Sequence, residues 1–270
     1  MSRIDAIFAS LRAGDRRAVM PFICGGSPAN TGEALGALEQ GGASIAEVGI
    51  PFSDPIADGP VIAAAMHRAL ERAITPARVF EEVAAARARL SIGVIAMCSV
   101  SIAHRLSAGA AVPFASFCRR LADAGFDGLI VPDIVLEESD AIRAAAAAHG
   151  LSCTLLVAPN TSPARAASIA HASTGFIYLM AQTGITGERD AAPDIAPAVA
   201  RIRSESSLPI ACGFGISTAA HVRAVVRQGG ADAAIVGSAM VRRMEAAAER
   251  DEDPCAEAER FTRELTAGLA

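Results

Sequence analysis

Short apolar runs recur along the whole chain, and each is followed by a longer stretch with helical periodicity. The runs are nearly continuously apolar, as in parallel strands that are buried on both faces. They lie at 18–23, 45–49, 93–97, 128–131, 153–157, 176–180, 209–212 and 233–236. Helical patterns lie at 31–40, 114–124, 137–148, 218–227 and 238–248. Eight strands alternating with helices predict a (β/α)8 barrel, or TIM barrel, although a doubly wound sheet has the same alternation and stays open on periodicity alone.

Additional helices are predicted around this repeat. Residues 2–12 form an amphipathic pattern before the first strand, with Ile4, Phe8 and Leu11 on one face. The interval between the second and third strands accommodates two helices, at 61–73 and 77–89, and 254–268 predicts a last helix. Because no proline- or serine-rich linker divides the chain, we expect residues 1–270 to form a single domain.

The composition limits the classes of protein to which the chain can belong. It has 270 residues, of which 52% are hydrophobic and 20% charged, so it can bury a large core. The net charge of −5, without a basic block, argues against nucleic acid or an anionic membrane as a partner. No stretch has the pattern of a signal peptide or a membrane span, and we expect a cytoplasmic protein.

All 24 basic residues are arginine, and the sequence contains no lysine. This excludes mechanisms that need a lysine amine, such as Schiff-base aldolases, pyridoxal-phosphate enzymes and the lysine of a P-loop. The six cysteines form no C-x-x-C pair and the five histidines are dispersed. We therefore expect reduced cysteines and no metal site.

The first candidate for chemistry is Glu47, near the end of the second predicted strand. Active sites of such barrels lie at the carboxyl ends of the strands. Side chains alternate along a strand, so Ile45, Glu47 and Gly49 share one face. A carboxylate buried in apolar surroundings has a raised pKa, which suits a general acid or base. The alternative is a structural glutamate paired with an arginine from another strand.

Asp58 lies in the loop that follows, just before Gly59 and Pro60. Two interpretations are about equally supported by the spacing. Asp58 is either the cap of the next helix or a carboxylate held over a pocket by the surrounding prolines and glycine. Asp54, in a Ser-Asp-Pro sequence, is more typical of a turn.

Glycine-rich loops follow the last two predicted strands, at 213–217 and 237–239. Glycines there allow backbone N–H groups to approach an oxyanion, and a helix beginning near Ser238 adds its positive end. The pattern favours a phosphate site that needs no lysine over ordinary turn glycines. A third loop, 182–188, is rich in Thr and Gly and is either a mobile lid or a plain solvent loop.

Together these segments resemble the tryptophan synthase α-subunit family. The most specific match is E-V-G-x-P-x-S-D-P-x-A-D-G-P at 47–60, and further matches lie at 183–187, 213–217 and 237–239. The resemblance implies a TIM barrel with an extra N-terminal helix that cleaves indole-3-glycerol phosphate to indole and glyceraldehyde 3-phosphate, a step of L-tryptophan biosynthesis. It also implies a β-subunit partner in an α2β2 assembly, with pyridoxal phosphate in the partner and no cofactor in this chain.

The resemblance also implies roles for individual residues. Glu47 resembles the acid/base that protonates indole C3, and Asp58 resembles the carboxylate that binds the indole N–H. Asp133 matches an aspartate that organises neighbouring loops, and Thr186 would close its loop onto Asp58. The implied phosphate ligands are Gly187, Gly215, Gly237 and Ser238. The implied lining of the indole pocket is Phe22, Ile62, Tyr178, Phe214 and Ile235.

Some positions depart from the family pattern. Ser27 stands where aspartate is usual, Ala63 where glutamine is common, and Val135 where proline often follows Asp133. The loop after the third strand, at 97–101, lacks the usual tyrosine or asparagine. Both carboxylates and the phosphate glycines are retained, so these departures concern the contact with the β subunit. Two further functions stay open: a stand-alone lyase that releases indole, and a non-catalytic subunit that binds a phosphate ligand and regulates a partner.

Overall fold

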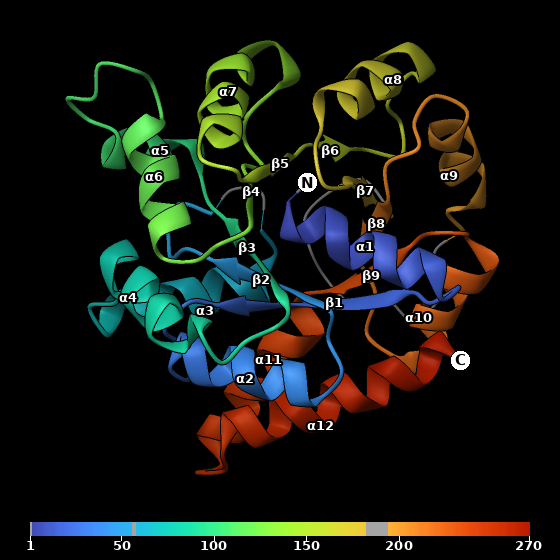
Figure 1. Ribbon diagram of the computed structural model, residues 1–270. Helices are drawn as coiled ribbons and strands as arrows, with labels where there is room; N and C mark the ends of the chain where they lie inside the picture. Colours follow the sequence, from blue (N-terminus) through green and yellow to red (C-terminus); the bar gives the residue numbers. More distant parts are fainter. Residues whose placement is uncertain (1, 56–57, 182–193) are drawn as a thin grey trace.

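The computed structural model describes residues 2–55, 58–181 and 194–270, and it has nine parallel strands in one sheet (Figure 1). The strand order is β5-β4-β3-β2-β1-β9-β8-β7-β6. The strands are β1 (Ala18–Cys24), β2 (Ile45–Gly49), β3 (Gly93–Met97), β4 (Gly128–Ile130), β5 (Ser152–Thr154), β6 (Leu156–Val157), β7 (Ile177–Met180), β8 (Ile210–Gly213) and β9 (Ala233–Val236).

The sheet curls into a nearly closed barrel. β5 and β6 lie at opposite ends of the strand order, yet only Leu155 separates them along the chain. The fifth predicted strand, 153–157, is thus divided between two edges of the sheet, and it brings those edges together. The barrel prediction is confirmed, and the doubly wound alternative is wrong because an open sheet would leave its two edge strands far apart.

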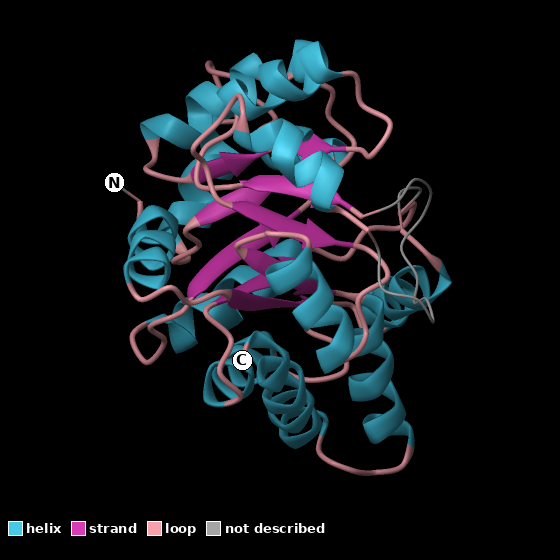
Figure 2. Cartoon of the chain, turned by 90° about the vertical axis from the view of Figure 1, so that its right-hand side faces the viewer, coloured by secondary structure: helices cyan, strands magenta, loops and turns pink. Residues whose placement is uncertain are grey.

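Helices surround the strands on the outside (Figure 2). The α-helices of the described residues are α1 (Arg3–Ala13), α2 (Thr31–Gln40), α3 (Pro60–Glu71), α4 (Pro76–Arg87), α5 (Val100–Leu106), α6 (Ala115–Asp123), α7 (Asp140–Ala148), α8 (Pro163–Ala172), α9 (Ala196–Arg203), α10 (Ala219–Arg223), α11 (Ser238–Glu249) and α12 (Pro254–Thr266), of which α1 lies at one end of the barrel. The extra helices predicted at 2–12, 61–73, 77–89 and 254–268 are confirmed as α1, α3, α4 and α12. The pattern at 218–227 divides into α10 and a π-helical turn, Ala224–Gln228.

Alternation along the strands separates two apolar layers. On β2, Ile45 packs inside the barrel, whereas Ala46 and Val48 pack outward against the helices. α1 closes the amino end of the barrel, since its Phe8 ring lies 5.9 Å from that of Phe176 inside. A capping box between Ser2 and Asp5 begins this helix. The amino end is therefore filled by side chains, and the carboxyl end is left for the candidate site.

Candidate active site

Glu47 is a buried carboxyl group inside the barrel. It projects from β2 on the inner face of the barrel, opposite Phe22 of β1 and Ile95 of β3 in the strand register. The residue is 1% exposed, and within the described part of the chain neither carboxylate oxygen has a hydrogen-bond partner. Burial raises the pKa of Glu47 from 4.5 to about 8. Since no arginine side chain among the described residues bonds to it, the alternative of a structural ion pair is not supported.

Asp58 lies at the same end of the barrel, in the loop from β2 to α3. The N-cap of α3 is Gly59, and Pro60 occupies its first turn, so Asp58 is not the cap of the helix. The Asp58 N–H donates to the carbonyl oxygen of Pro55 over 3.0 Å. Burial raises the pKa of the Asp58 carboxyl from 3.8 to about 6. The interpretation of a carboxylate held over a pocket is therefore the one that fits.

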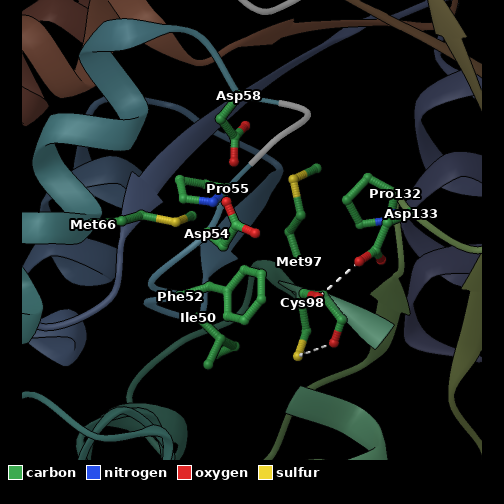
Figure 3. A pocket seen from close by; sticks show the side chains of 11 residues that line it. Ile50, Phe52, Asp54, Pro55, Asp58, Met66, Met97, Cys98, Pro132 and Asp133 are labelled. Atoms are coloured by element: carbon green, nitrogen blue, oxygen red, sulfur yellow. Dashed lines mark hydrogen bonds between the residues drawn. The ribbon is translucent and has the colours of Figure 1, made fainter. Parts of the chain in front are cut away.

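The pocket beneath Asp58 has an empty volume of about 380 Å³, including space open to solvent (Figure 3). Its lining combines three carboxylates with apolar and sulfur-containing side chains. The lining residues are Ile50, Phe52, Asp54, Pro55, Asp58, Met66, Met97, Cys98, Ser99, Pro132 and Asp133. Sequence reasoning missed Phe52, Met66 and Met97 as pocket residues. Two periodicities could have identified the methionines, because Met97 lies two residues after the inward-facing Ile95 and Met66 lies one helical turn after Ile62.

Asp133, unlike Glu47 among the described residues, has hydrogen-bond partners. Its Oδ2 accepts from the hydroxyl of Ser99 over 2.7 Å, and its Oδ1 accepts from the N–H of Val100 over 2.9 Å. Val100 is the first residue of α5, so the Asp133 carboxylate satisfies a free N–H at the beginning of that helix. The contact joins the loop after β4 to the loop after β3 at the edge of the pocket.

The five residues expected to line an indole pocket lie in or against two buried clusters. Tyr178 and Ile235 belong to the cluster inside the barrel, Phe214 packs against it, and the rings of Tyr178 and Phe214 meet edge to face at 6.2 Å. Phe22 and Ile62 pack with Met66 in the second cluster. Burial, followed by the nearby Glu47 carboxylate, raises the pKa of the Tyr178 hydroxyl. An aromatic and aliphatic wall therefore adjoins Glu47.

Two glycine-containing loops meet beside these clusters. β8 and β9 are neighbouring strands, so the loop after Gly213 and the beginning of α11 lie side by side. Phe214 and Gly215 have φ values of +77° and +81°, in the left-handed region of backbone conformation. Glycine adopts this region readily, which accounts for Gly215. α11 begins at Ser238 directly after Gly237, and its first N–H groups have no acceptor within the helix. This geometry suits an oxyanion.

Part of the predicted site lies outside the described residues. Thr186 and Gly187 fall in 182–193. Among the residues that the structure describes, no cluster of His, Cys, Asp and Glu could hold a metal ion. None of the described helices is long and apolar enough to cross a membrane.

Comparisons with known proteins identify the family of the chain. The family model described as tryptophan synthase alpha chain matches residues 8–270. The tryptophan synthase alpha chain of Prochlorococcus marinus is 46% identical over 91% of this chain and 88% of its own length. The corresponding figures for Chloroflexus aurantiacus are 43%, 100% and 99%.

Solved structures extend the comparison. A tryptophan synthase structure from Mycobacterium tuberculosis has a TM-score of 0.86 at 32% identity, covering 99% of this chain and 98% of that one. Tryptophan synthase subunit alpha from Legionella pneumophila has a TM-score of 0.89 at 29% identity, covering 100% and 98%. The chain belongs to the tryptophan synthase alpha chain family, lyases that cleave indole-3-glycerol phosphate in tryptophan biosynthesis.

Proposed function

We propose that Glu47 and Asp58 carry out the cleavage of indole-3-glycerol phosphate in this chain. The observation that carries the proposal is the pair of unequal carboxylates at one end of the barrel, with pKa values of about 8 and about 6. At neutral pH Glu47 holds its proton and Asp58 has lost its own. When the surroundings of two carboxyl groups separate their pKa values in this way, the group with the higher pKa is the acid and the other is the anion.

The reaction is a retro-aldol cleavage that needs neither an imine nor a metal ion. Protonated Glu47 donates to C3 of the indole ring, and positive charge develops on the ring nitrogen. The anionic Asp58 accepts a hydrogen bond from the indole N–H and stabilises that charge. The bond between C3 and the glycerol chain then breaks, its electrons restore the indole ring, and the hydroxyl proton of the chain passes to Glu47. The products are indole and glyceraldehyde 3-phosphate, with Glu47 protonated again.

The remaining site residues bind the two ends of the substrate. Phe22, Ile62, Tyr178, Phe214 and Ile235 provide the apolar wall for the indole. Gly215, Gly237 and Ser238 supply backbone N–H groups for the phosphate, together with Gly187. Thr186, which lies outside the described residues, is a further substrate-binding residue, and Asp133 keeps the neighbouring loops in place. The support is the two adjoining clusters and the free N–H groups at the beginning of α11.

The partner of this chain is the tryptophan synthase β subunit, in an α2β2 assembly within the cytoplasm. Solved tryptophan synthase structures from Mycobacterium tuberculosis contain chains that match 99% and 100% of this chain. Pyridoxal phosphate belongs to the partner, because this chain contains no lysine that could form the Schiff base. The residues of this chain therefore act only in the cleavage step.

Indole release from indole-3-glycerol phosphate tests the proposal, with the purified chain alone and with a β subunit added. We expect weak release alone and a strong increase with the partner. Fast release alone would identify a stand-alone lyase instead. No release under either condition, from a folded protein that still binds inorganic phosphate, would contradict the catalytic roles and favour a regulatory binding subunit.

A further inference from the structure

Two helices that begin at the candidate site are joined by a partly buried ion pair. α3 begins two residues after Asp58, and α11 begins at Ser238. Nε of Arg68 on α3 donates to Oε2 of Glu245 on α11 over 2.9 Å. The Arg68 side chain is 35% exposed and that of Glu245 is 7% exposed. The bond therefore links α3, the helix that follows Asp58, to α11, the helix whose beginning is the proposed phosphate site.

The ion pair lies at nearly the same depth in both helices. A helix advances by about 1.5 Å per residue, which places Arg68 about 12 Å from the first residue of α3 and Glu245 about 10 Å from the first residue of α11. The helices also meet at their beginnings, where a Cβ atom on Gly237 would lie 3.6 Å from Cδ1 of Ile62. The contact at Gly237 and the ion pair together fix the position of the beginning of α3 relative to the beginning of α11.

Glu245 depends on Arg68 for its hydrogen bonding. The other carboxylate oxygen, Oε1, is buried and has no hydrogen-bond partner among the described residues. A carboxylate in such surroundings interacts strongly and directionally with the one guanidinium that reaches it. Both charges of the pair act on the buried thiol of Cys24, whose pKa rises to about 12: burial and then Glu245 raise it, Arg68 lowers it, and Asp58 raises it further. The ion pair and the candidate carboxylate are thus near the same buried thiol.

We propose that Arg68 and Glu245 are positioning residues that set the distance between Asp58 and the phosphate-binding end of α11. The inference rests on the proposed function, in which one substrate molecule spans both places. A ligand that carries an indole at one end and a phosphate at the other binds tightly only when both ends engage together. Neither Arg68 nor Glu245 touches the substrate, and their effect is on the separation of the groups that do.

The test compares linked and separate ligands on the full chain. Titration calorimetry measures the Kd of inorganic phosphate, of indole, and of a non-cleavable indole joined through three carbons to a phosphate monoester. In Arg68→Met we expect about tenfold weaker binding of the linked ligand, with the Kd of each separate ligand changed by less than about twofold. A merely structural role would weaken all three ligands together, and that result would overturn the proposal.

The chain offers a closely matched control. Arg12 and Asp232 form an ion pair of 3.1 Å between α1 and the amino end of β9, with side chains 36% and 7% exposed. The exposures equal those of Arg68 and Glu245 to within one percentage point, but the pair lies at the opposite end of the barrel. Asp232 also keeps Arg203 as a partner, so the control for the charge left on Glu245 is the double variant Arg68→Met/Glu245→Met. Arg12→Met should leave the linked ligand bound as in the original chain. An equal loss of affinity for the linked ligand in both variants would mean that the effect comes from lower overall stability, and it would overturn the proposal.

Two further variants separate positioning from folding. Because Arg68→Met leaves Glu245 buried without a cation, Arg68→Met/Glu245→Met removes both charges and keeps the variant folded. It should show the same selective loss, and full affinity for the linked ligand would overturn the proposal. Glu245→Gln keeps an acceptor for Arg68 and should retain most of the affinity. If the original chain binds the linked ligand but never cleaves the substrate, the proposed function fails while this inference still stands.

Discussion

Buried carboxylates at the two ends of the barrel have opposite environments. Glu47, toward the carboxyl end, is 1% exposed, and Asp232, at the amino end, is 5% exposed. Within the described chain Glu47 has no hydrogen-bond partner, and burial raises its pKa to about 8. Burial would raise the pKa of Asp232 too, but hydrogen bonds from Arg12, the Ile210 N–H and Arg203 outweigh it and lower the pKa.

The difference shows that burial alone does not decide the charge of a carboxyl group. At the amino end the guanidinium of Arg12 contacts both oxygens of Asp232, from Nε and Nη2, each over 3.1 Å. This arrangement stabilises the fold. Toward the carboxyl end a protonated acid is kept available at the expense of stability.

Replacing Glu47 with Gln should remove the catalytic proton. We expect the rate of indole release to fall by about 10²- to 10⁴-fold, as is typical for a lost general acid or base. Binding of the non-cleavable indole phosphate should change little, because only the transition state needs the proton. Substantial remaining activity would show that the assignment of the acid is wrong. Steady-state kinetics and calorimetry on the same preparation provide the measurement.

Replacing Asp232 with Asn should destabilise the fold and leave the chemistry intact. Arg12 and Arg203 lose their carboxylate, and breaking such a partly buried network costs about 3 kcal/mol. Because the pKa of Asp232 is lowered in the folded state, its stabilisation is complete above the ordinary value of 3.8 and is lost as pH falls through the folded value. Urea denaturation should therefore give the same difference at pH 5 and pH 7. The exposed pair Arg250–Glu252 is the control, and Glu252→Gln should have no measurable effect.

The Glu47→Gln variant should also become more stable than the original chain, by a margin that grows as pH rises. Between the ordinary pKa of 4.5 and about 8, the unfolded state releases the Glu47 proton and the folded state keeps it, so the original chain loses stability with increasing pH. Gln does not titrate, and the difference should grow by roughly 2–3 kcal/mol from pH 5 to pH 7. Asp58 titrates alike in both proteins and cancels. A difference independent of pH in urea denaturation would contradict the raised pKa.

Sequence patterns predicted the barrel well because each element depends on nearby residues. Continuous apolar runs predicted the strands, and alternation along β2 predicted that Glu47 faces inward with Ile45. Glycines after β8 and β9 identified the loops that meet beside the candidate site. These features need only the period of a strand and the backbone freedom of glycine.

The partners of buried charges could not be predicted in the same way. Arg12 and Asp232 are 220 positions apart, and Arg68 and Glu245 are 177 apart. Their pairing depends on how the barrel closes, and closure depends on the division of one strand between two sheet edges. The capping alternative for Asp58 was likewise settled only by the backbone, which makes Gly59 the N-cap. Whether a carboxylate is paired is therefore a property of the fold.

The two carboxylates at the candidate site should produce a bell-shaped pH profile. kcat/KM for cleavage should rise as Asp58 ionises near pH 6 and fall as Glu47 loses its proton near pH 8. One pH unit beyond either limit, the value should be about tenfold lower. Asp58→Asn should remove the acidic limb and keep the alkaline one. A profile that is flat between pH 5 and pH 9 would exclude both groups as the titrating acid and base.

Asp133 shows whether the role of a carboxylate depends on its end of the barrel or on its hydrogen-bond partners. It lies at the carboxyl end, like Glu47, yet it accepts hydrogen bonds from Ser99 and the Val100 N–H, as Asp232 does from its own partners. If pairing decides the role, Asp133→Ala should lower the free energy of unfolding by about 1 kcal/mol and reduce kcat only a few-fold. Hydrogen exchange should show faster exchange of the Val100 amide and its neighbours at the beginning of α5, with the amides of β2 unchanged. A loss of activity as large as that of Glu47→Gln would mean that position at this end of the barrel outweighs pairing.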